Sequence, residues 1–380
     1  MPTNHQTANA QPIQPRITVL GLGGGGCNTI NRLSSLRLPG IRLAAANTDA
    51  LALNACSADV HILLGRGLTR GLGSGGDPEV GSQAAEESYK ELIEAIKGTG
   101  ILFLTAGMGG GTGSGAIQIT ARIARSLDVL TIAIVTTPFS FESGLRTQTA
   151  RESTTRLRGF VDTLITIPND RLIGLTSRDT TLRTAFALSD DLLIKGIQSI
   201  SGMIHSSGLL NIDFSHILRL MRQEGGCYIS NGYANGAEKA TAALHSALNH
   251  PLLEEIPLKE ARGMVVKFSG ALSLAEVQGA MKFLKESVSP NAEVITALED
   301  IDLPEGQAHV MVLVTGIGAI PVLDQPLASQ TSAKEIGLEI VEPASRSDSS
   351  GYIAADASPD DLEVPAFIRR GYNQVAHALR

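Results

Sequence analysis

Residues 101–116, ILFLTAGMGGGTGSGA, combine a short apolar run with a long run of glycines. The apolar residues indicate a buried strand, and the apolar spacing of residues 117–127 predicts a helix. The glycine run 107–115 therefore joins a strand to a helix, where a flexible surface loop is rare. Glycines let a backbone approach a ligand, and a helix N-terminus attracts anions. With the hydroxyls of Thr112 and Ser114, the stretch predicts a phosphate-binding loop.

The composition limits the classes of function. A chain of 380 residues with 43% hydrophobic residues allows about two domains with real cores, and 4% aromatic residues make those cores aliphatic. The net charge of −7 argues against broad nucleic-acid binding. Cys27, Cys56 and Cys227 are isolated in sequence and signal neither a zinc site nor a disulfide framework. Without a signal peptide or a long apolar run, we expect a cytoplasmic protein that does not insert into a membrane.

A second glycine-rich loop follows the first predicted strand, residues 16–20. Gly21, Gly23 and Gly26 satisfy the pattern G-x-G-x-x-G, which by itself suggests a Rossmann dinucleotide site. The acidic residue that should bind the ribose lies about 20 residues on in such sites. The next carboxylate here is Asp49, which fits that spacing loosely. An NAD-dependent oxidoreductase therefore remains an alternative at this point.

Strands that alternate with helices predict an α/β fold with a parallel, doubly wound sheet in the first half of the chain. Ligands bind at the carboxyl ends of the strands in such sheets. The polar or glycine-rich loops that follow predicted strands are residues 21–28, 47–49, 107–115, 137–142 and 168–170. We therefore expect one composite site at one edge of the sheet.

The second half of the chain changes in character. Apolar residues recur with helical spacing through residues 180–207, and a polar loop follows. The predicted domains are a disordered N-terminus (1–15), a nucleotide-binding domain (16–178), a central helix (179–207), a smaller α+β domain (208–320), a flexible linker (321–360) and a docking tail (361–380). The tail places apolar anchors beside paired arginines, which suggests a partner-docking peptide over a chance sequence. Its anchors are Val364, Pro365, Phe367, Ile368, Arg369 and Arg370.

The absence of G-x-x-x-x-G-K-[ST] and of the kinase motifs excludes two large nucleotide-binding classes. Two glycine loops on one sheet favour a nucleotide with several phosphates. The segment GMGGGTGSG resembles the signature of the tubulin/FtsZ family of GTPases. Further resemblance lies in VLGLGGGGCNTINRL, ANTDALAL, LGRGLTRGLGSGGDPEVG, TPFSFE, VDTLITIPNDRL, GLLNIDF and VPAFIRR. It covers roughly residues 16–318 and 362–370.

This resemblance implies GTP or GDP as the ligand, with Mg²⁺ as a cofactor and without a metal site built from protein side chains. It implies that glycines of both loops hold phosphates, that Glu142 and Arg146 flank the ribose, and that Asn169, Phe186 and Asp190 recognise guanine. The implied nucleotide-binding residues are Gly23, Gly24, Gly25, Gly26, Cys27, Asn28, Asn47, Asp49, Gly109, Gly110, Gly111, Thr112, Gly113, Glu142, Arg146, Asn169, Phe186 and Asp190.

The resemblance also implies that hydrolysis is completed by a neighbouring subunit. The family's catalytic loop has the pattern N-x-D-F-A-D, and its acidic residues orient the attacking water. Here the matching residues are Asn211, Asp213 and His216, so a histidine stands where the family has its second aspartate. Neutral histidine supplies no permanent negative charge. We therefore expect intact GTP binding and assembly, with slowed hydrolysis.

The expected function is a GTPase that polymerises head to tail into the bacterial division ring. Its expected partners are further copies of itself and, through the tail, membrane-tethering and division proteins at the division site. The alternative is a divergent paralogue that copolymerises with or regulates filaments and hydrolyses little GTP itself. His216 favours this alternative, whereas the retained tail is compatible with both.

Overall fold

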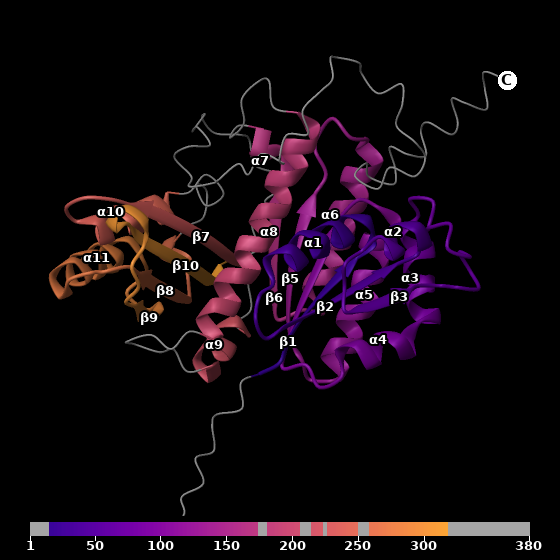
Figure 1. The fold of residues 1–380 in the computed structure, drawn as a ribbon, viewed down its shortest axis with the longest axis horizontal. Coiled ribbons are helices and arrows are strands. Elements are labelled where there is room, and N and C mark those ends of the chain that lie inside the picture. Colours follow the sequence, from indigo (N-terminus) through magenta and orange to yellow (C-terminus); the bar gives the residue numbers. More distant parts are fainter. Residues whose placement is uncertain (1–14, 174–180, 206–213, 223–225, 250–257, 318–380) are drawn as a thin grey trace, which may run out of the picture.

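The computed structural model describes residues 15–173, 181–205, 214–222, 226–249 and 258–317. These residues form two sheets, and one long helix runs between them (Figure 1). The tail residues, Asn211 and Asp213 lie outside the described part of the chain.

The first sheet has the strand order β3-β2-β1-β4-β5-β6, and every printed pairing within it is parallel. Its strands are β1 (Ile17–Leu22), β2 (Ile41–Asn47), β3 (Val60–Leu63), β4 (Ile101–Gly107), β5 (Leu130–Thr137) and β6 (Thr163–Pro168). Continuous apolar runs such as that of β1 suit strands whose two faces are both covered. The expected doubly wound parallel sheet is thereby confirmed.

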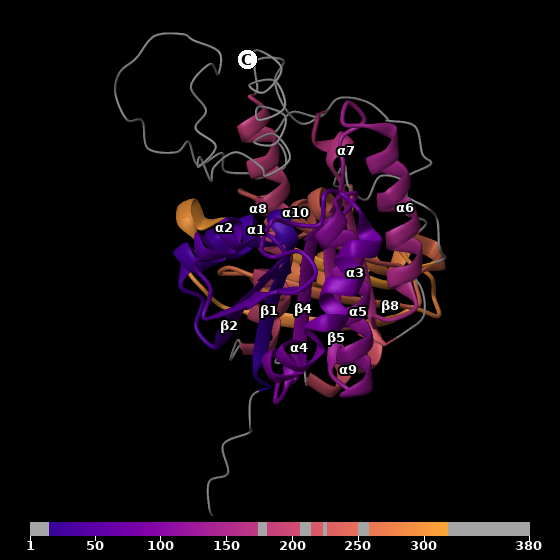
Figure 2. The ribbon, with the colours of Figure 1, turned by 90° about the vertical axis from the view of Figure 1, so that its right-hand side faces the viewer.

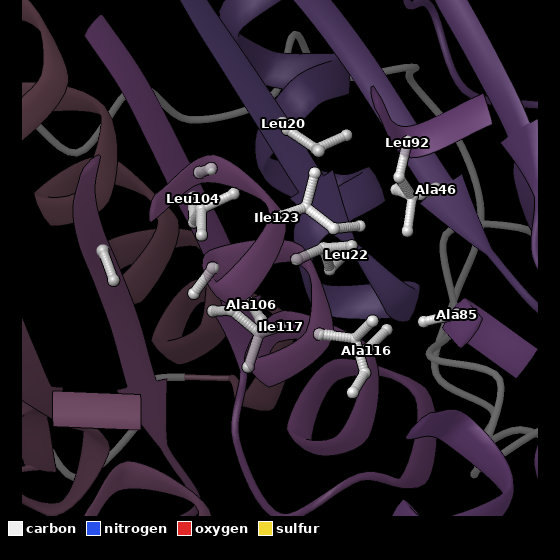
Figure 3. Packing of buried hydrophobic residues seen from close by; sticks show 14 of the residues in the cluster. Leu20, Leu22, Ala46, Ala85, Leu92, Leu104, Ala106, Ala116, Ile117 and Ile123 are labelled. Carbon is white, nitrogen blue, oxygen red and sulfur yellow. The ribbon is translucent and has the colours of Figure 1, made fainter. Parts of the chain in front are cut away.

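Helices cover both faces of this sheet. They are α1 (Gly23–Leu36), α2 (Ala50–Asn54), α3 (Pro78–Glu87), α4 (Tyr89–Ile96), α5 (Gly111–Ser126), α6 (Gly144–Arg158) and α7 (Asn169–Ile173). Helices α3, α4, α5 and α6 lie on the face away from the second sheet (Figures 1 and 2). Their core joins Leu20, Leu22 and Leu104 of the strands to Ile117 and Ile123 of α5 (Figure 3).

The second sheet has the order β7-β10-β8-β9, in which β8 and β9 are parallel and the other neighbours antiparallel. Its strands are β7 (Gly226–Ala234), β8 (Gly263–Ser269), β9 (Glu293–Glu299) and β10 (Ala308–Ile317). Helices α10 (Lys239–Leu248) and α11 (Leu274–Ser287) pack against it and bury a separate core. Short 3₁₀ turns lie at η1 (Leu258–Glu260) and η2 (Pro304–Gly306). The expected mixed α+β character of this part is confirmed.

The long helix α8 (Leu182–His205) connects the two halves. Leu193, Ile197 and Ile200 lie in one core with β1, α1 and part of the second sheet. Its 24 residues span about 36 Å at 1.5 Å per residue. The helix α9 (Phe214–Met221) follows at the end of the first sheet where the strands begin, since Thr163 Oγ1 donates to the carbonyl oxygen of Met221 at 3.0 Å.

Several expected boundaries differ from those observed. Helices α1 and α5 begin inside the glycine runs, at Gly23 and Gly111, because glycine's low helix propensity masks a start that packing imposes. After Asp77 the chain forms two helices that meet at Ser88, whose Oγ accepts from the Gly65 amide at 3.1 Å. Strand β7 and helix α11 were not predicted at all, although Ser273 and Glu276 form a capping box that signals the start of α11.

Candidate functional site

The two glycine-rich loops meet at the edge of the first sheet where β1 and β4 end. A Cβ built on Gly23 would lie 2.9 Å from the amide nitrogen of Gly113. A Cβ on Gly25 would lie 2.9 Å from the amide nitrogen of Gly107. Side chains at these positions would push the loops apart, so the glycines are required for the contact. The expected convergence of these two loops is observed.

The N-termini of α1 and α5 have no side-chain cap, a feature that they share with α4 and α10. The preceding residues, Leu22 and Gly110, provide no side-chain cap, and neither first turn contains an acidic residue. Side-chain caps begin α2, α3, α6 and α11, from Asp49, Asp77, Ser143 and Ser273. The first turns of α1 and α5 thus present backbone N–H groups that an anion can bind. At Gly24 a Cβ would meet nothing within 4 Å, which leaves room for a ligand.

Three hydroxyl groups gather beside the start of α5. Thr112 Oγ1 lies 2.6 Å from Thr48 Oγ1 and 3.1 Å from Ser74 Oγ. Thr48 follows β2, and Ser74 belongs to the loop that precedes α3. These hydroxyls tie the loops after β2 and β3 to the second glycine run. Hydroxyl groups can donate hydrogen bonds to phosphate oxygens. Their oxygen atoms are also ligands that suit a hydrated magnesium ion.

Glu142 and Arg146 form an ion pair next to the second glycine run. Arg146 Nη1 lies 2.8 Å from Glu142 Oε2, and the Glu142 side chain is only 7% exposed. The amide of Phe139 donates to Glu142 Oε1 at 2.9 Å, which holds the loop after β5 in place. A Cβ on Gly109 would lie 2.7 Å from the carbonyl oxygen of Arg146, so α6 starts directly against the glycine run.

The three residues expected to recognise a base lie on α7, which begins at Asn169, and on α8, which contains Phe186 and Asp190. Ser189 Oγ donates to Asn169 Oδ1 at 2.7 Å, which fixes the buried Asn169 amide. Phe186 packs edge-on against Phe139, with ring centroids 5.3 Å apart. These contacts join α8 to the start of α7 and to the loop after β5.

Asp190 on α8 contacts two residues of α1. Its Oδ2 lies 3.3 Å from Nε of Arg32, and Thr29 Oγ1 lies 3.5 Å from its Oδ1. Burial raises the pKa of the Asp190 carboxyl to about 7, although Arg32 and the hydrogen bond from Thr29 both act to lower it. A carboxyl group poised near neutrality is available to accept hydrogen bonds from a ligand.

The remaining expected residues of the first loop and of β2 surround the start of α1. Asn47 Nδ2 lies 3.7 Å from Cys27 Sγ, and both residues are buried. Asp49 caps α2 by accepting from the Ala52 amide at 3.0 Å. Asn28 is exposed on the first turns of α1. The capping contact of Asp49 gives this residue a structural role.

His216 does not lie at this edge. It occupies the first turn of α9 and is exposed to solvent. Helix α9 lies at the lower end of α8 in Figure 1, and its last residue contacts the start of β6. Within one chain, His216 and the uncapped helix starts are at opposite ends of the first sheet.

The structure adds residues that sequence reasoning missed, namely Arg32, Thr48, Ser74, Phe139 and Ser189. Thr48 lies between two residues that the sequence did single out, so its loop position was a usable signal. No signal in the sequence pointed to Arg32, because its partner Asp190 lies 158 residues away in the chain. Among the described residues, no group of three His, Cys, Asp or Glu side chains could hold a metal ion. None of the described helices has the length and apolarity to cross a membrane.

Comparison with known proteins identifies the family behind this geometry. The family model "Tubulin/FtsZ family, GTPase domain" matches residues 16–177, and "FtsZ family, C-terminal domain" matches residues 225–318. The cell division protein FtsZ of Azotobacter vinelandii is 37% identical over 93% of this chain and 96% of its own length. The chain belongs to the tubulin/FtsZ family. It carries the GTPase domain of that family, so the dinucleotide oxidoreductase alternative is wrong.

Other members of the tubulin/FtsZ family are similar to this chain in sequence and in structure. Cell division protein FtsZ 1 of Rhizobium meliloti is 41% identical over 83% of this chain, which spans 54% of that relative's length. A solved structure described as "FtsZ dimer, empty (M. jannaschii)" is 36% identical, with a TM-score of 0.74 over 80% of this chain and 89% of that chain. The expected tubulin/FtsZ fold and family are confirmed.

Proposed function

We propose that this chain binds GTP at the carboxyl edge of its first sheet and polymerises head to tail into filaments of the bacterial division ring. The main observation that supports this proposal is the pair of uncapped, glycine-rich helix starts, which approach one another closely at Gly23 and Gly113. Relatives at 37% identity are named cell division proteins, and a relative at 36% has a solved dimer. The proposed site of action is the cytoplasmic side of the division site.

In this proposal, each part of the nucleotide has its own residues. The N–H groups of α1 and α5 bind the phosphates, and a magnesium ion held mainly by phosphate and water oxygens fits beside the hydroxyl of Thr112. The Glu142–Arg146 pair contacts the ribose. Asn169 and Asp190 hydrogen-bond to guanine, whose N1–H and N2–H groups suit a carboxylate acceptor, and Phe186 packs on the base.

We further propose that hydrolysis requires the next subunit. Helix α8 is about 36 Å long and leads from the nucleotide edge to the start of α9. In a head-to-tail contact, α9 of one copy would therefore approach the glycine loops of the next. His216, with Asn211 and Asp213 from the preceding segment, would then position the attacking water.

A divergent paralogue that copolymerises but hydrolyses little is a second candidate. Its motivating observation is that the first turn of α9 contains no acidic residue, because His216 occupies the position of the family's second aspartate. In either case, we propose that the domain division given above holds and that residues 361–380 dock membrane-tethering and division partners.

Sedimentation of the pure chain with GTP, with GDP and without nucleotide tests the proposal, with phosphate release followed in the same tubes. We expect pelleting with GTP only, and phosphate release only from the pelleted protein. A chain truncated after residue 360 should pellet equally, because the tail is assigned to partners rather than to assembly. Equal pelleting in all three conditions, or loss of pelleting on truncation, would contradict the respective assignment.

The pKa of Asp190 predicts a pH dependence of nucleotide affinity. Burial brings the pKa of this carboxyl group to about 7, and only its ionised form can accept from both N1–H and N2–H of guanine with its two oxygens. GDP affinity should therefore rise with pH up to about pH 7, by at most about tenfold per unit, and then level off. The dissociation constant of GDP between pH 5.5 and 8 measures this.

Two variants control that measurement. Asp190→Asn should bind GDP weakly, with a flat pH profile between pH 5.5 and 8. Asp191→Asn removes a neighbouring carboxyl that raises the pKa of Asp190, so it should keep the slope and move its midpoint slightly lower. A wild-type slope that survives in Asp190→Asn would rule out this residue as the titrating group.

A further inference from the structure

Two of the three cysteines lie together in the folded chain. Cys27 is in the second turn of α1, and Cys56 follows α2, 29 residues later. Both side chains are buried, at 2% and 5% exposure. The third cysteine, Cys227 on β7, is buried in a different part of the chain. The fold therefore creates a thiol pair that the spacing in sequence did not signal.

The Cys56 thiol contacts Cys27 directly. Cys56 Sγ donates to the carbonyl oxygen of Cys27 at 3.5 Å, and the interaction between the two thiols shifts the pKa of each. On its other side, Cys27 Sγ lies 3.7 Å from the Asn47 amide. Through its carbonyl oxygen and its sulfur, Cys27 thus connects the segment after α2 with the polar residue that ends β2.

The pair is asymmetric in acidity. The hydrogen bond from Cys27 lowers the pKa of the Cys56 thiol, against the effect of its burial. The pKa of Cys27 is raised, first by that same hydrogen bond and then by burial. Thiolates are the nucleophiles in thiol chemistry, so Cys56 reacts first and Cys27 lies in position to resolve the product.

We propose that Cys27 and Cys56 are an oxidation site at which a peroxide forms a reversible intramolecular disulfide beside the first glycine-rich loop. The Cys56 thiolate attacks one oxygen of hydrogen peroxide and becomes a sulfenic acid, and the released hydroxide takes a proton to give water. The Cys27 sulfur then attacks the sulfenic sulfur and loses its proton, and a second water leaves. Two thiols supply two electrons to one peroxide.

Oxidation changes the surroundings of α1. A disulfide holds its sulfurs at about 2.05 Å, closer than any non-bonded contact between two sulfurs, so the segment after α2 is drawn toward α1. The Cys27 sulfur no longer offers the same acceptor to Asn47. The effect on ligand binding rests on the proposed nucleotide site. There, the loss of this hydrogen bond should weaken GDP binding about fivefold, which corresponds to one neutral hydrogen bond.

The test exposes the fully reduced full-length chain to hydrogen peroxide and digests it with trypsin. Cleavage after arginine places Cys27 in peptide 17–32, Cys56 in peptide 43–66 and Cys227 in a separate peptide that begins at residue 223. We expect peptides 17–32 and 43–66 to be linked, with a loss of two hydrogens, and to separate again with dithiothreitol. GDP affinity is measured on the same reduced and oxidised samples.

Cys227→Ser is the matched control, because it removes a buried thiol without touching the pair. It should form the same link, whereas Cys27→Ser and Cys56→Ser should not. Overoxidation of Cys56 without a link, or links only between two chains, would overturn the proposal. The wild-type link is read without nucleotide and without a variant that must fold. The disulfide link should therefore be found even if GDP bound to neither the reduced nor the oxidised sample. Absence of GDP binding from both samples would overturn the nucleotide site and not the disulfide.

Discussion

Replacing His216 with aspartate should raise GTP turnover in assembled protein at least tenfold. A correctly placed acid–base group is worth roughly 10²–10⁴ in rate, and the carboxylate would add a fixed negative charge that orients water. His216 is exposed in the first turn of α9, where an acidic residue interacts favourably with the helix dipole. The substitution should therefore not destabilise the helix. Phosphate release per mass of pelleted polymer measures the effect.

His216→Asn is the control for this prediction, because it has nearly the size of aspartate but no charge. It should assemble and turn over GTP at about the wild-type rate, and the melting temperatures of all three proteins should agree closely. Equal turnover of wild type and His216→Asp would refute the idea that this position limits hydrolysis. That result would also remove the reason to consider a hydrolysis-poor paralogue.

Replacing Gly115 with alanine should destabilise the fold by about 3 kcal/mol or more. Helices α3 and α5 cross with their backbones in contact, and a Cβ on Gly115 would lie 2.0 Å from the carbonyl oxygen of Pro78 and 2.6 Å from the Ser82 amide nitrogen. Backbone cannot move aside as a flexible side chain can. The helices would have to separate, which would also displace the second glycine run at the start of α5.

Gly144→Ala is the matched control, since Gly144 begins α6 and a Cβ there meets nothing within 4 Å. Alanine forms helices better than glycine by about 1 kcal/mol, so this variant should be equally or slightly more stable. A loss of about 3 kcal/mol in Gly115→Ala should lower Tm by about 6–12 °C for a domain of this size. Calorimetry of the two variants without added nucleotide measures the difference. Similar melting temperatures would show that the crossing yields easily.

Local sequence was sufficient to predict the first sheet and the loops that gather at its edge. Long apolar strands separated by helices allow few arrangements other than a parallel sheet, and such a sheet brings all its carboxyl ends together. The glycine runs were recognisable for the same reason, because they follow strands directly. Prediction was weaker in the second half, where β7 contains Asn231 and Gly232 and becomes a strand only by pairing with β10. A Cβ on Gly232 would lie 2.1 Å from the Ala243 carbonyl oxygen, so its glycine serves the packing of α10.

The sequence by itself determined the fold class, the family and the glycine run 107–115, since each depends on patterns within a few neighbouring residues. Only the tertiary structure decided which distant groups meet. It brought Arg32 to Asp190, Thr48 to Thr112 and Cys27 to Cys56. It also placed α9 at the far end of the first sheet from the glycine loops. Such contacts depend on how helices pack on the sheet, and the energies of burial and close packing that set this arrangement are shared among residues far apart in the chain.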